Sequence, residues 1–371
     1  MINKKILYLC DYSLDAIGGA QKSLLTMANA MDQLGYKVII TSDLIKDKEF
    51  SVSENITIQQ WKKPANKYMA IISKMFLLIK CIRKYKPDVV HAQFSQFAFA
   101  MLLARKYKLI SGKVPLVFTD RHHFLGYNDR YKNMFVNNLG YLKKIIFTTE
   151  NNRKEWEKAL GHEIEHSAVV SNVLEDKWFE QKCESPNHDG KIYVGFAGRF
   201  VDWKRWDTVL EISEKLCKDG RYVISIAISA PKGEEKSVDD YIKQLEEKTR
   251  GQLNVVRDGD EDEMLKFYGE LDFFVLTSEN ESFGRTLIEA MTQNTVVLST
   301  NSGGAPEVVG RNDTIFEVAD SEEASNIIKT IAFDESKLDS YKKWFNNRSK
   351  SFSRDSMKQK MNDIYMQILD N

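Results

Sequence analysis

Two glutamates flank a glycine at a point where an apolar strand gives way to a helix. Residues 277–291 read Thr-Ser-Glu-Asn-Glu-Ser-Phe-Gly-Arg-Thr-Leu-Ile-Glu-Ala-Met, and a helix is expected to begin near Gly284. The first amides of a helix have no partner within it and lie at the positive end of its dipole, so a diphosphate fits there. Glu281 and Glu289 would lie on either side of that diphosphate. Each carboxylate can accept hydrogen bonds from the paired hydroxyls of a sugar or a ribose.

The same stretch also has a purely structural interpretation. Glu281 would then cap the helix, and Glu289 would be a solvated helix residue. Two cations favour the chemical interpretation, because Arg199 and Lys204 follow the first strand of the second half of the chain. They can neutralise phosphates and stabilise a leaving group as charge develops on it. Two surface cations after a strand are the alternative.

The first half of the chain offers two further polar loops. Gly18-Gly19 follows the first strand, and its amides are candidates for contact with a phosphate or an acceptor; a flexible entry to the next helix is the alternative. Asp120-Arg-His-His follows a later strand, so His122 and His123 are expected at the carboxyl edge of the sheet. Ligands of open parallel sheets bind beyond that edge.

Strands and helices alternate along the whole chain, which predicts an α/β protein with two doubly wound parallel sheets. A polar stretch with Pro and Gly at 180–190 separates the two series. We therefore expect an N-terminal Rossmann-like domain over residues 1–180 and a C-terminal one over 181–352. The start of the chain reads as a strand rather than a signal peptide, and no apolar run reaches the roughly 18 residues of a spanning helix.

Charge is unevenly distributed although the total is zero. Residues 1–180 hold 27 Lys and Arg against 18 Asp and Glu, and 51–150 alone hold 17 against 5. The segment 61–86 mixes eight basic residues with Met and aliphatic residues, which is consistent with an interfacial helix on an anionic membrane. A core-packed helix with a lysine-rich outer face is the alternative. The expected location is the cytoplasm, with association to the inner face of a membrane through this segment.

One stretch of the sequence matches a metal-binding motif but is not expected to bind a metal. His162-Glu-Ile-Glu-His166 satisfies the HExxH pattern of zinc proteases, but that pattern needs a helix. Gly161 is expected to end the preceding helix, so no metal site is predicted.

The motifs together resemble the retaining family 4 glycosyltransferases of GT-B fold. Four occur in order: Gly18-Gly19, the Gly-Arg…Lys run ending at Lys204, the Glu-x7-Glu pair with Phe-Gly after the first Glu, and Ser302-Gly-Gly-Ala-Pro-Glu. The resemblance covers nearly the whole chain. It implies two domains facing each other across a cleft, the first binding the acceptor and the second the nucleotide-sugar donor, with a final helix, about 353–371, packing back on the first domain.

The resemblance also implies roles for the site residues. Glu281 would contact donor sugar hydroxyls and act in catalysis, Glu289 would bind the ribose, and one of His122 and His123 would position the reacting groups. The donor diphosphate would be held by Arg199 and Lys204 and by the backbone of Phe283, Gly284, Arg285 and Thr286.

The expected reaction moves a hexose-type sugar from a nucleotide-diphosphate sugar to a hydroxyl of a glycan, a lipid-linked saccharide or a cell-envelope polymer. A UDP-sugar is favoured on family frequency alone. Neither a cofactor nor a metal is expected, and no nucleic-acid partner. A non-catalytic GT-B partner subunit, a sugar phosphorylase and an epimerase are the alternatives.

Overall fold

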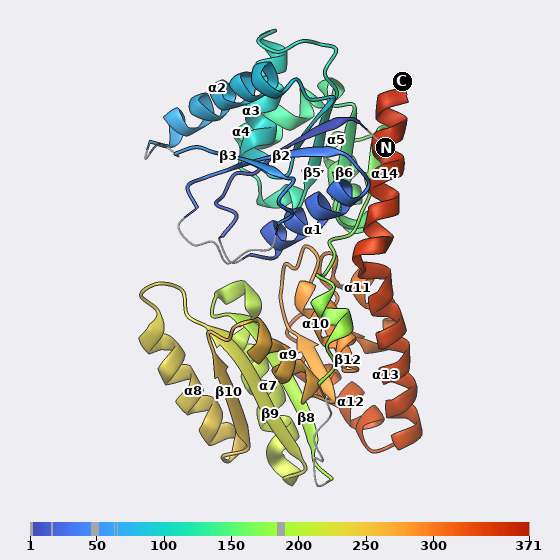
Figure 1. Cartoon of the computed structure of the whole chain (residues 1–371). Helices are drawn as coiled ribbons and strands as arrows, with labels where there is room; N and C mark the ends of the chain where they lie inside the picture. Colours follow the sequence, from blue (N-terminus) through green and yellow to red (C-terminus); the bar gives the residue numbers. More distant parts are fainter. Residues whose placement is uncertain are drawn as a thin grey trace. The chain divides into compact units, whose positions relative to one another are not determined.

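The computed structural model describes residues 3–15, 18–45, 52–62, 64, 66–183 and 190–370 (Figure 1). It forms two compact units, Met1–Glu175 with Arg354–Asn371, and Asp176–Ser353. We call them the first and second unit. The predicted linker at 180–190 falls largely, at 184–189, outside the described residues.

The first unit is built on a seven-stranded sheet of order β3-β2-β1-β4-β5-β6-β7, in which every pair is parallel. Its strands are β1 (Lys5–Leu9), β2 (Lys37–Ser42), β3 (Thr57–Gln60), β4 (Val89–Ala92), β5 (Leu116–Asp120), β6 (Lys144–Phe147) and β7 (Ser167–Val169). Its helices are α1 (Gly19–Gln33), α2 (Lys67–Tyr85), α3 (Ser95–Lys106), α4 (Asp129–Val136), α5 (Glu150–Leu160) and α14 (Arg354–Asp370), with short 3₁₀ turns η1 (Phe124–Gly126) and η2 (Leu139–Tyr141).

Alternate residues of the strands point to opposite faces of this sheet, and both faces are buried. Ile6 and Tyr8 pack beneath α1 and α14, whereas Leu7 and Leu9 pack beneath α2 and α3. Burial on both faces explains why β1 and β2 are nearly continuous apolar runs, as in parallel sheets generally.

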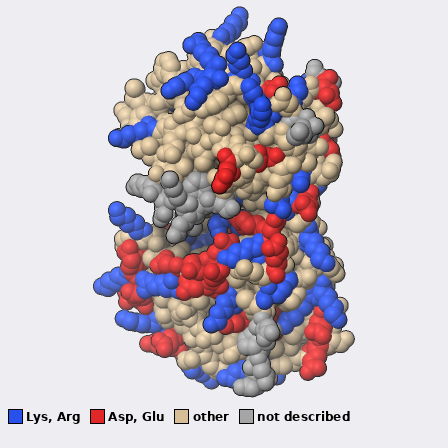
Figure 2. Space-filling model, viewed as in Figure 1, with Lys and Arg blue, Asp and Glu red and all other residues tan. Residues whose placement is uncertain are grey.

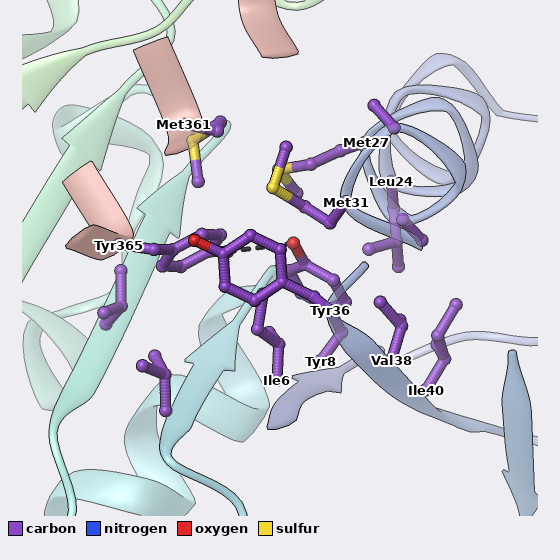
Figure 3. Packing of buried hydrophobic residues seen from close by; sticks show 14 of the residues in the cluster. Ile6, Tyr8, Leu24, Met27, Met31, Tyr36, Val38, Ile40, Met361 and Tyr365 are labelled. Carbon is purple, nitrogen blue, oxygen red and sulfur yellow. Dashed lines mark hydrogen bonds between the residues drawn. The ribbon is translucent and has the colours of Figure 1, made fainter. Parts of the chain in front are cut away.

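The final helix α14 inserts Tyr365 into the core of the first unit (Figure 3). The Tyr365 hydroxyl donates to the Tyr8 hydroxyl at 2.9 Å and lies 2.6 Å from Nδ1 of His91. The other ring nitrogen, Nε2, is 2.7 Å from Oγ1 of Thr119. Each ring nitrogen of His91 thus has one hydroxyl partner, Tyr365 at Nδ1 and Thr119 at Nε2. Burial, and secondarily Arg121, holds the pKa of His91 well below its ordinary value, so the ring is neutral.

The second unit is built on a six-stranded parallel sheet of order β10-β9-β8-β11-β12-β13. Its strands are β8 (Ile192–Arg199), β9 (Tyr222–Ser229), β10 (Leu253–Arg257), β11 (Phe273–Leu276), β12 (Val296–Thr300) and β13 (Ile315–Phe316). Its helices are α6 (Lys177–Glu180), α7 (Trp206–Leu216), α8 (Glu235–Thr249), α9 (Glu261–Gly269), α10 (Arg285–Thr292), α11 (Ala305–Val309), α12 (Ser321–Ala332) and α13 (Glu335–Ser349). Short 3₁₀ turns are η3 (Asp202–Lys204), η4 (Cys217–Asp219), η5 (Asn312–Thr314) and η6 (Lys350–Phe352).

The predicted fold class is confirmed, since both sheets are parallel and helix-covered. The unit boundary lies at Glu175 rather than at residue 180, because Trp178 packs in the second unit. Its Nε1 donates to Oε1 of Glu261 at 3.0 Å, and its ring lies 6.0 Å from that of Tyr268. Among the described residues, no helix combines the length and apolar character needed to span a bilayer.

Candidate functional site

Gly284 sets the geometry at the start of α10. The helix begins at Arg285, one residue later than the sequence pattern suggests, and Gly284 is its N-cap with φ +84°. A Cβ at this position would lie 2.8 Å from Cδ1 of Leu287, and side chains rarely adopt this backbone conformation. No acidic side chain occupies the first turn. The amides of Arg285 and Thr286 are therefore not neutralised by an acidic side chain of that turn, although the Gly284 amide before them is bound by Glu281.

Glu281 and Lys204 form an ion pair beside this helix end. Nζ of Lys204 lies 2.8 Å from Oε2 of Glu281, and the two side chains are 14% and 12% exposed. The other carboxylate oxygen, Oε1, accepts from the Gly284 amide at 3.2 Å. Ser278 adds a weaker contact, at 3.4 Å, from its hydroxyl to Oε2. The structure thus brings together two predicted site residues whose positions are 77 apart in the chain.

Hydrogen bonds to backbone carbonyls hold the segments that carry these two side chains. The Gly304 amide donates to the Glu281 carbonyl at 2.8 Å, which ties the loop before α10 to the glycine-rich loop after β12. The Thr277 hydroxyl donates to the Lys204 carbonyl at 2.8 Å, and the Glu279 amide donates to the Trp203 carbonyl at 2.8 Å. The loop after β11 and η3 consequently form one hydrogen-bonded assembly.

Glu289 is not a solvated helix residue. Its Oε1 accepts from Nε of Arg285 at 2.8 Å, and its Oε2 accepts from the Tyr268 hydroxyl at 3.2 Å. Burial, together with this carboxylate, raises the pKa of Tyr268 well above its ordinary value, so the hydroxyl stays a donor. The side chain of Arg285 is thus engaged within α10, whereas its backbone amide lies in the first turn with that of Thr286.

The remaining predicted donor residues differ in exposure. Arg199 is exposed at the carboxyl end of β8, and its carbonyl accepts from Nε1 of Trp206 at 2.9 Å. Phe283 is buried and packs edge-on against Phe352, with ring centroids 5.8 Å apart. Phe283 is therefore a structural anchor of the loop, and only its backbone is available to a ligand.

The two histidines after β5 have different surroundings. His122 is exposed, and its amide donates to Oδ1 of the buried Asp120 at 3.1 Å. His123 is partly buried, with Nδ1 3.3 Å from Oε1 of Glu155. Burial raises the pKa of Glu155, but the hydrogen bond and charge of His123, together with hydrogen bonds from Asn151 and the Phe124 backbone, outweigh it and the pKa falls below its ordinary value. His122 is thus the more accessible ring.

Asp120 itself is a structural residue. It accepts from the Tyr127 hydroxyl at 2.5 Å and from Nε1 of Trp156 at 2.6 Å. Burial raises its pKa. These contacts hold the end of β5, from which His122 and His123 follow.

Gly18 and Gly19 lie at the entry to α1. Gly18 is the N-cap in an extended conformation that any residue can adopt, and it supplies no side-chain cap. The first turn of α1 holds no acidic residue, so its amides also form a positive helix end. Residues 16 and 17, just before it, lie outside the described residues.

Sequence reasoning missed a polar cluster at the carboxyl edge of the first sheet. The Arg121 guanidinium donates to Oε1 of Gln93 at 2.8 Å and to Oδ1 of Asn172. Burial lowers the pKa of Arg121 to about 10. Each of the three residues follows a different strand, which is the only signal that the sequence offers.

The HExxH-like stretch at residues 162–166 does not form a helix. Helix α5 ends at Leu160, with Gly161 as its left-handed cap, and residues 162–166 have no helical structure. Among the described residues, no group of three or more His, Cys, Asp or Glu side chains is arranged to hold a metal ion.

Comparison with known proteins decides the family. Residues 17–177 match the family model Glycosyltransferase Family 4, and residues 179–350 match the model Glycosyl transferases group 1. The two matches together span most of the chain. The chain is a family 4-type glycosyltransferase of GT-B fold.

Two relatives and one solved structure are similar to this chain. The glycosyltransferase is 26% identical to an uncharacterized 41.2 kDa protein in the cps region of Klebsiella pneumoniae, over 75% of this chain and 79% of that protein. It is 21% identical to the GPI3 subunit of phosphatidylinositol N-acetylglucosaminyltransferase from Saccharomyces cerevisiae, over 89% and 77%. Its fold is similar to that of Anabaena HepE in complex with UDP and glucose, with a TM-score of 0.77, 18% identity and coverage of 98% and 100%.

Proposed function

We propose that this glycosyltransferase transfers a hexose-type sugar from a UDP-sugar to an acceptor hydroxyl with retention of anomeric configuration. The Lys204–Glu281 pair beside the amino end of α10 carries the proposal. The amides of Arg285 and Thr286 face the diphosphate, and Lys204 neutralises it. Glu281 accepts from sugar hydroxyls, and Glu289, fixed by Tyr268 and Arg285, accepts from the ribose. Arg199 adds a second cation at the end of β8.

UDP is favoured because a solved structure of the same fold holds UDP and glucose. In the reaction, the acceptor oxygen bonds to the anomeric carbon on the face from which the diphosphate leaves, as the bond to the diphosphate oxygen breaks. The departing phosphate oxygen takes the acceptor proton, and the transition state resembles an oxocarbenium ion. Cationic and amide groups supply the charge stabilisation, so no metal is needed.

Binding and transfer by the chain alone test this proposal. UDP is expected to raise the thermal unfolding temperature more than GDP or ADP, because only a bound ligand stabilises the folded state. NMR of the transfer product is expected to show the anomeric configuration of the donor. An inverted product would refute the mechanism. Binding of UDP without transfer, even to a suitable acceptor, would favour the partner-subunit alternative.

His122 is proposed to position the donor sugar and the acceptor hydroxyl, as the more exposed of the two rings. His122→Ala is expected to lower turnover about 100-fold, because small losses of alignment cost this much. His123→Ala is expected to lower stability more than turnover, since it leaves Glu155 without its imidazole partner. Steady-state kinetics and thermal unfolding of both variants check this. The reverse ranking of turnover would assign the role to His123.

The acceptor is proposed to be a glycan, lipid-linked saccharide or envelope polymer reached at the cytoplasmic face of a membrane. The support lies in α2, where Met69, Ile72 and Phe76 are 52%, 42% and 64% exposed on one side. Basic side chains gather over the part of the first unit where α2 and α3 lie (Figure 2). An apolar stripe with basic neighbours favours an anionic bilayer.

One lysine of this segment has a different role. Lys74 is fully buried and pairs with Asp11 at 2.7 Å, so it cannot reach a membrane. Asp11 also accepts from the amides of Gln96 and Phe97, at 2.8 and 2.9 Å, which caps α3. Lys74 therefore joins α2 to the end of β1, whereas the exposed Lys80 and Arg83 of α2 are left for lipid.

Phe76→Glu is expected to weaken sedimentation with anionic vesicles about tenfold or more, through the loss of buried apolar area. Phe333→Glu, at a partly exposed phenylalanine of the second unit, is the matched control. Added salt is expected to weaken binding of the wild type, because it screens surface charges. Equal sedimentation of the two variants would remove α2 as the contact.

A further inference from the structure

A hollow of the second unit lies beside η3, between the beginning of α7 and the middle of α8. Its volume is about 650 Å³, within the range of sites that hold small ligands. Phe200, Trp206 and Tyr241 form its aromatic side, with ring centroids 5.3 to 6.2 Å apart. Phe200 and Tyr241 have no role in the donor site described above, and Trp206 touches it only through the Arg199 carbonyl.

The polar atoms of these rings are used within the protein. Nε1 of Trp206 donates to the carbonyl of Arg199 at 2.9 Å, and the Tyr241 hydroxyl donates to the carbonyl of Trp206 at 2.8 Å. The rings are thus fixed in place. Trp206 and Tyr241 are only 6% and 8% exposed, so the aromatic surface open to a ligand belongs mainly to the partly buried Phe200 that packs on them. Carbon-bound hydrogens of a ligand pack well against such surface, because the ring face carries partial negative charge.

The rest of the lining is rich in hydrogen-bonding groups and is net negative. Three carboxylates, of Asp202, Asp207 and Glu279, stand against one guanidinium, that of Arg205, and the amide of Gln244 is added. Arg205 is bound by Asp207 through Nε at 2.9 Å and Nη2 at 2.6 Å. This hydrogen bonding lowers the pKa of Asp207, so the carboxylate is ionised at neutral pH.

The charge decides which ligand class fits. A nucleotide or phosphate would be repelled, because three carboxylates exceed the one cation, which is already paired. A neutral sugar is not repelled. Its hydroxyls can donate to the carboxylates and bond with the Gln244 amide, while the C–H face of the ring packs on the aromatic side.

We propose that this pocket binds a neutral pyranose unit of the acceptor glycan, as a subsite separate from the donor diphosphate. The proposal rests on the proposed glycosyl transfer for its link to the reaction. Two segments are shared with the donor site. In η3, Lys204 contacts Glu281 whereas Asp202 lines the pocket; in the loop after β11, Glu279 lines the pocket two residues before Glu281.

Because η3 and the loop after β11 line both sites, the position of the pocket indicates which part of the substrate it holds. A sugar in the pocket lies next to the donor segments but does not occupy them, so it is a unit of the acceptor other than the one that reacts. The acceptor is therefore an oligosaccharide or polysaccharide chain, free or lipid-linked, rather than a monosaccharide.

Direct binding of neutral oligosaccharides tests the subsite. The full chain is saturated with UDP and titrated with a panel of neutral gluco-, galacto- and manno-oligosaccharides, and saturation-transfer NMR reports which sugar protons contact aromatic protons. Wild type is expected to bind at least one member. Phe200→Ala is expected to weaken that binding about tenfold, because it removes part of the aromatic side. Glu279→Gln is expected to weaken it less.

Two controls separate the subsite from folding and from the donor site. Glu246→Gln, at an exposed glutamate of α8 outside the pocket, is expected to bind as wild type does. UDP affinity and the unfolding temperature, measured for every variant, are expected to stay close to wild type. No binding of any panel member to wild type, or equal binding by Phe200→Ala, overturns the subsite. Failure of UDP to bind wild type would instead overturn the proposed function. Saccharide binding would still test the subsite in that case.

Discussion

Replacing Glu281 with glutamine is expected to lower turnover by about 100- to 1000-fold, the usual effect of removing one group that stabilises a developing charge. The carboxylate faces the amino end of α10 and is held by Lys204 and the Gly284 amide. Glutamine keeps the size and one oxygen but loses the charge that complements an oxocarbenium ion. The loss should therefore fall on kcat more than on KM for the donor. Steady-state kinetics with a donor series measure this split.

The Lys204–Glu281 ion pair also contributes to the stability of the fold, and removing one partner lowers that stability. The sequence alone predicts that Glu281→Ala abolishes turnover and leaves the thermal unfolding temperature roughly unchanged. The structure modifies that expectation, because alanine leaves the partly buried Nζ of Lys204 without its partner, at a cost of about 1–3 kcal/mol. A double variant, Lys204→Gln with Glu281→Gln, removes both charges and should recover part of the stability but no activity. Wild-type turnover by Glu281→Gln would refute the catalytic role.

Tyr365→Ala is expected to destabilise the first unit by about 3–5 kcal/mol, as large aromatic truncations in a core do. The side chain is fully buried beneath the sheet, and its loss opens a cavity among Tyr8, Met361 and their neighbours (Figure 3). It also removes the hydroxyl that pairs with Nδ1 of His91. Chemical denaturation, followed by probes specific to each unit, measures the effect, since two units need not unfold together.

Two matched variants separate the cavity from the hydrogen bonds. Tyr365→Phe keeps the ring and loses only the hydroxyl, so about 1–3 kcal/mol is expected. Met366→Ala, at the exposed neighbouring position, should change stability by less than about 0.5 kcal/mol. If Tyr365→Ala unfolded like Met366→Ala, α14 would not be part of the core of the first unit.

The sequence pattern predicts the strands that are apolar and the loops that follow them. It misses β3 and β13, because Thr57-Ile-Gln-Gln is not an apolar run and Ile315-Phe316 is only two residues long. Such short edge strands are identified by their partners in the sheet rather than by their own composition.

Side-chain partners that are distant in sequence could not be predicted. Lys74 looks like its neighbouring lysines in the chain, and only the fold shows that it is buried on Asp11, 63 residues earlier. The Gln93–Arg121–Asn172 cluster likewise depends on three strand ends meeting at one sheet edge. Lys204 and Glu281 were identified separately by type and position, whereas their direct pairing required the structure.

A crystal structure of the protein with UDP-glucose is the most direct test of the central claim, that the diphosphate binds at the amino end of α10. The account predicts phosphate oxygens within about 3 Å of the Arg285 and Thr286 amides, with Nζ of Lys204 on the phosphate and the glucose hydroxyls on Glu281. A nucleotide bound elsewhere, with Lys204 still paired only to Glu281, would contradict it.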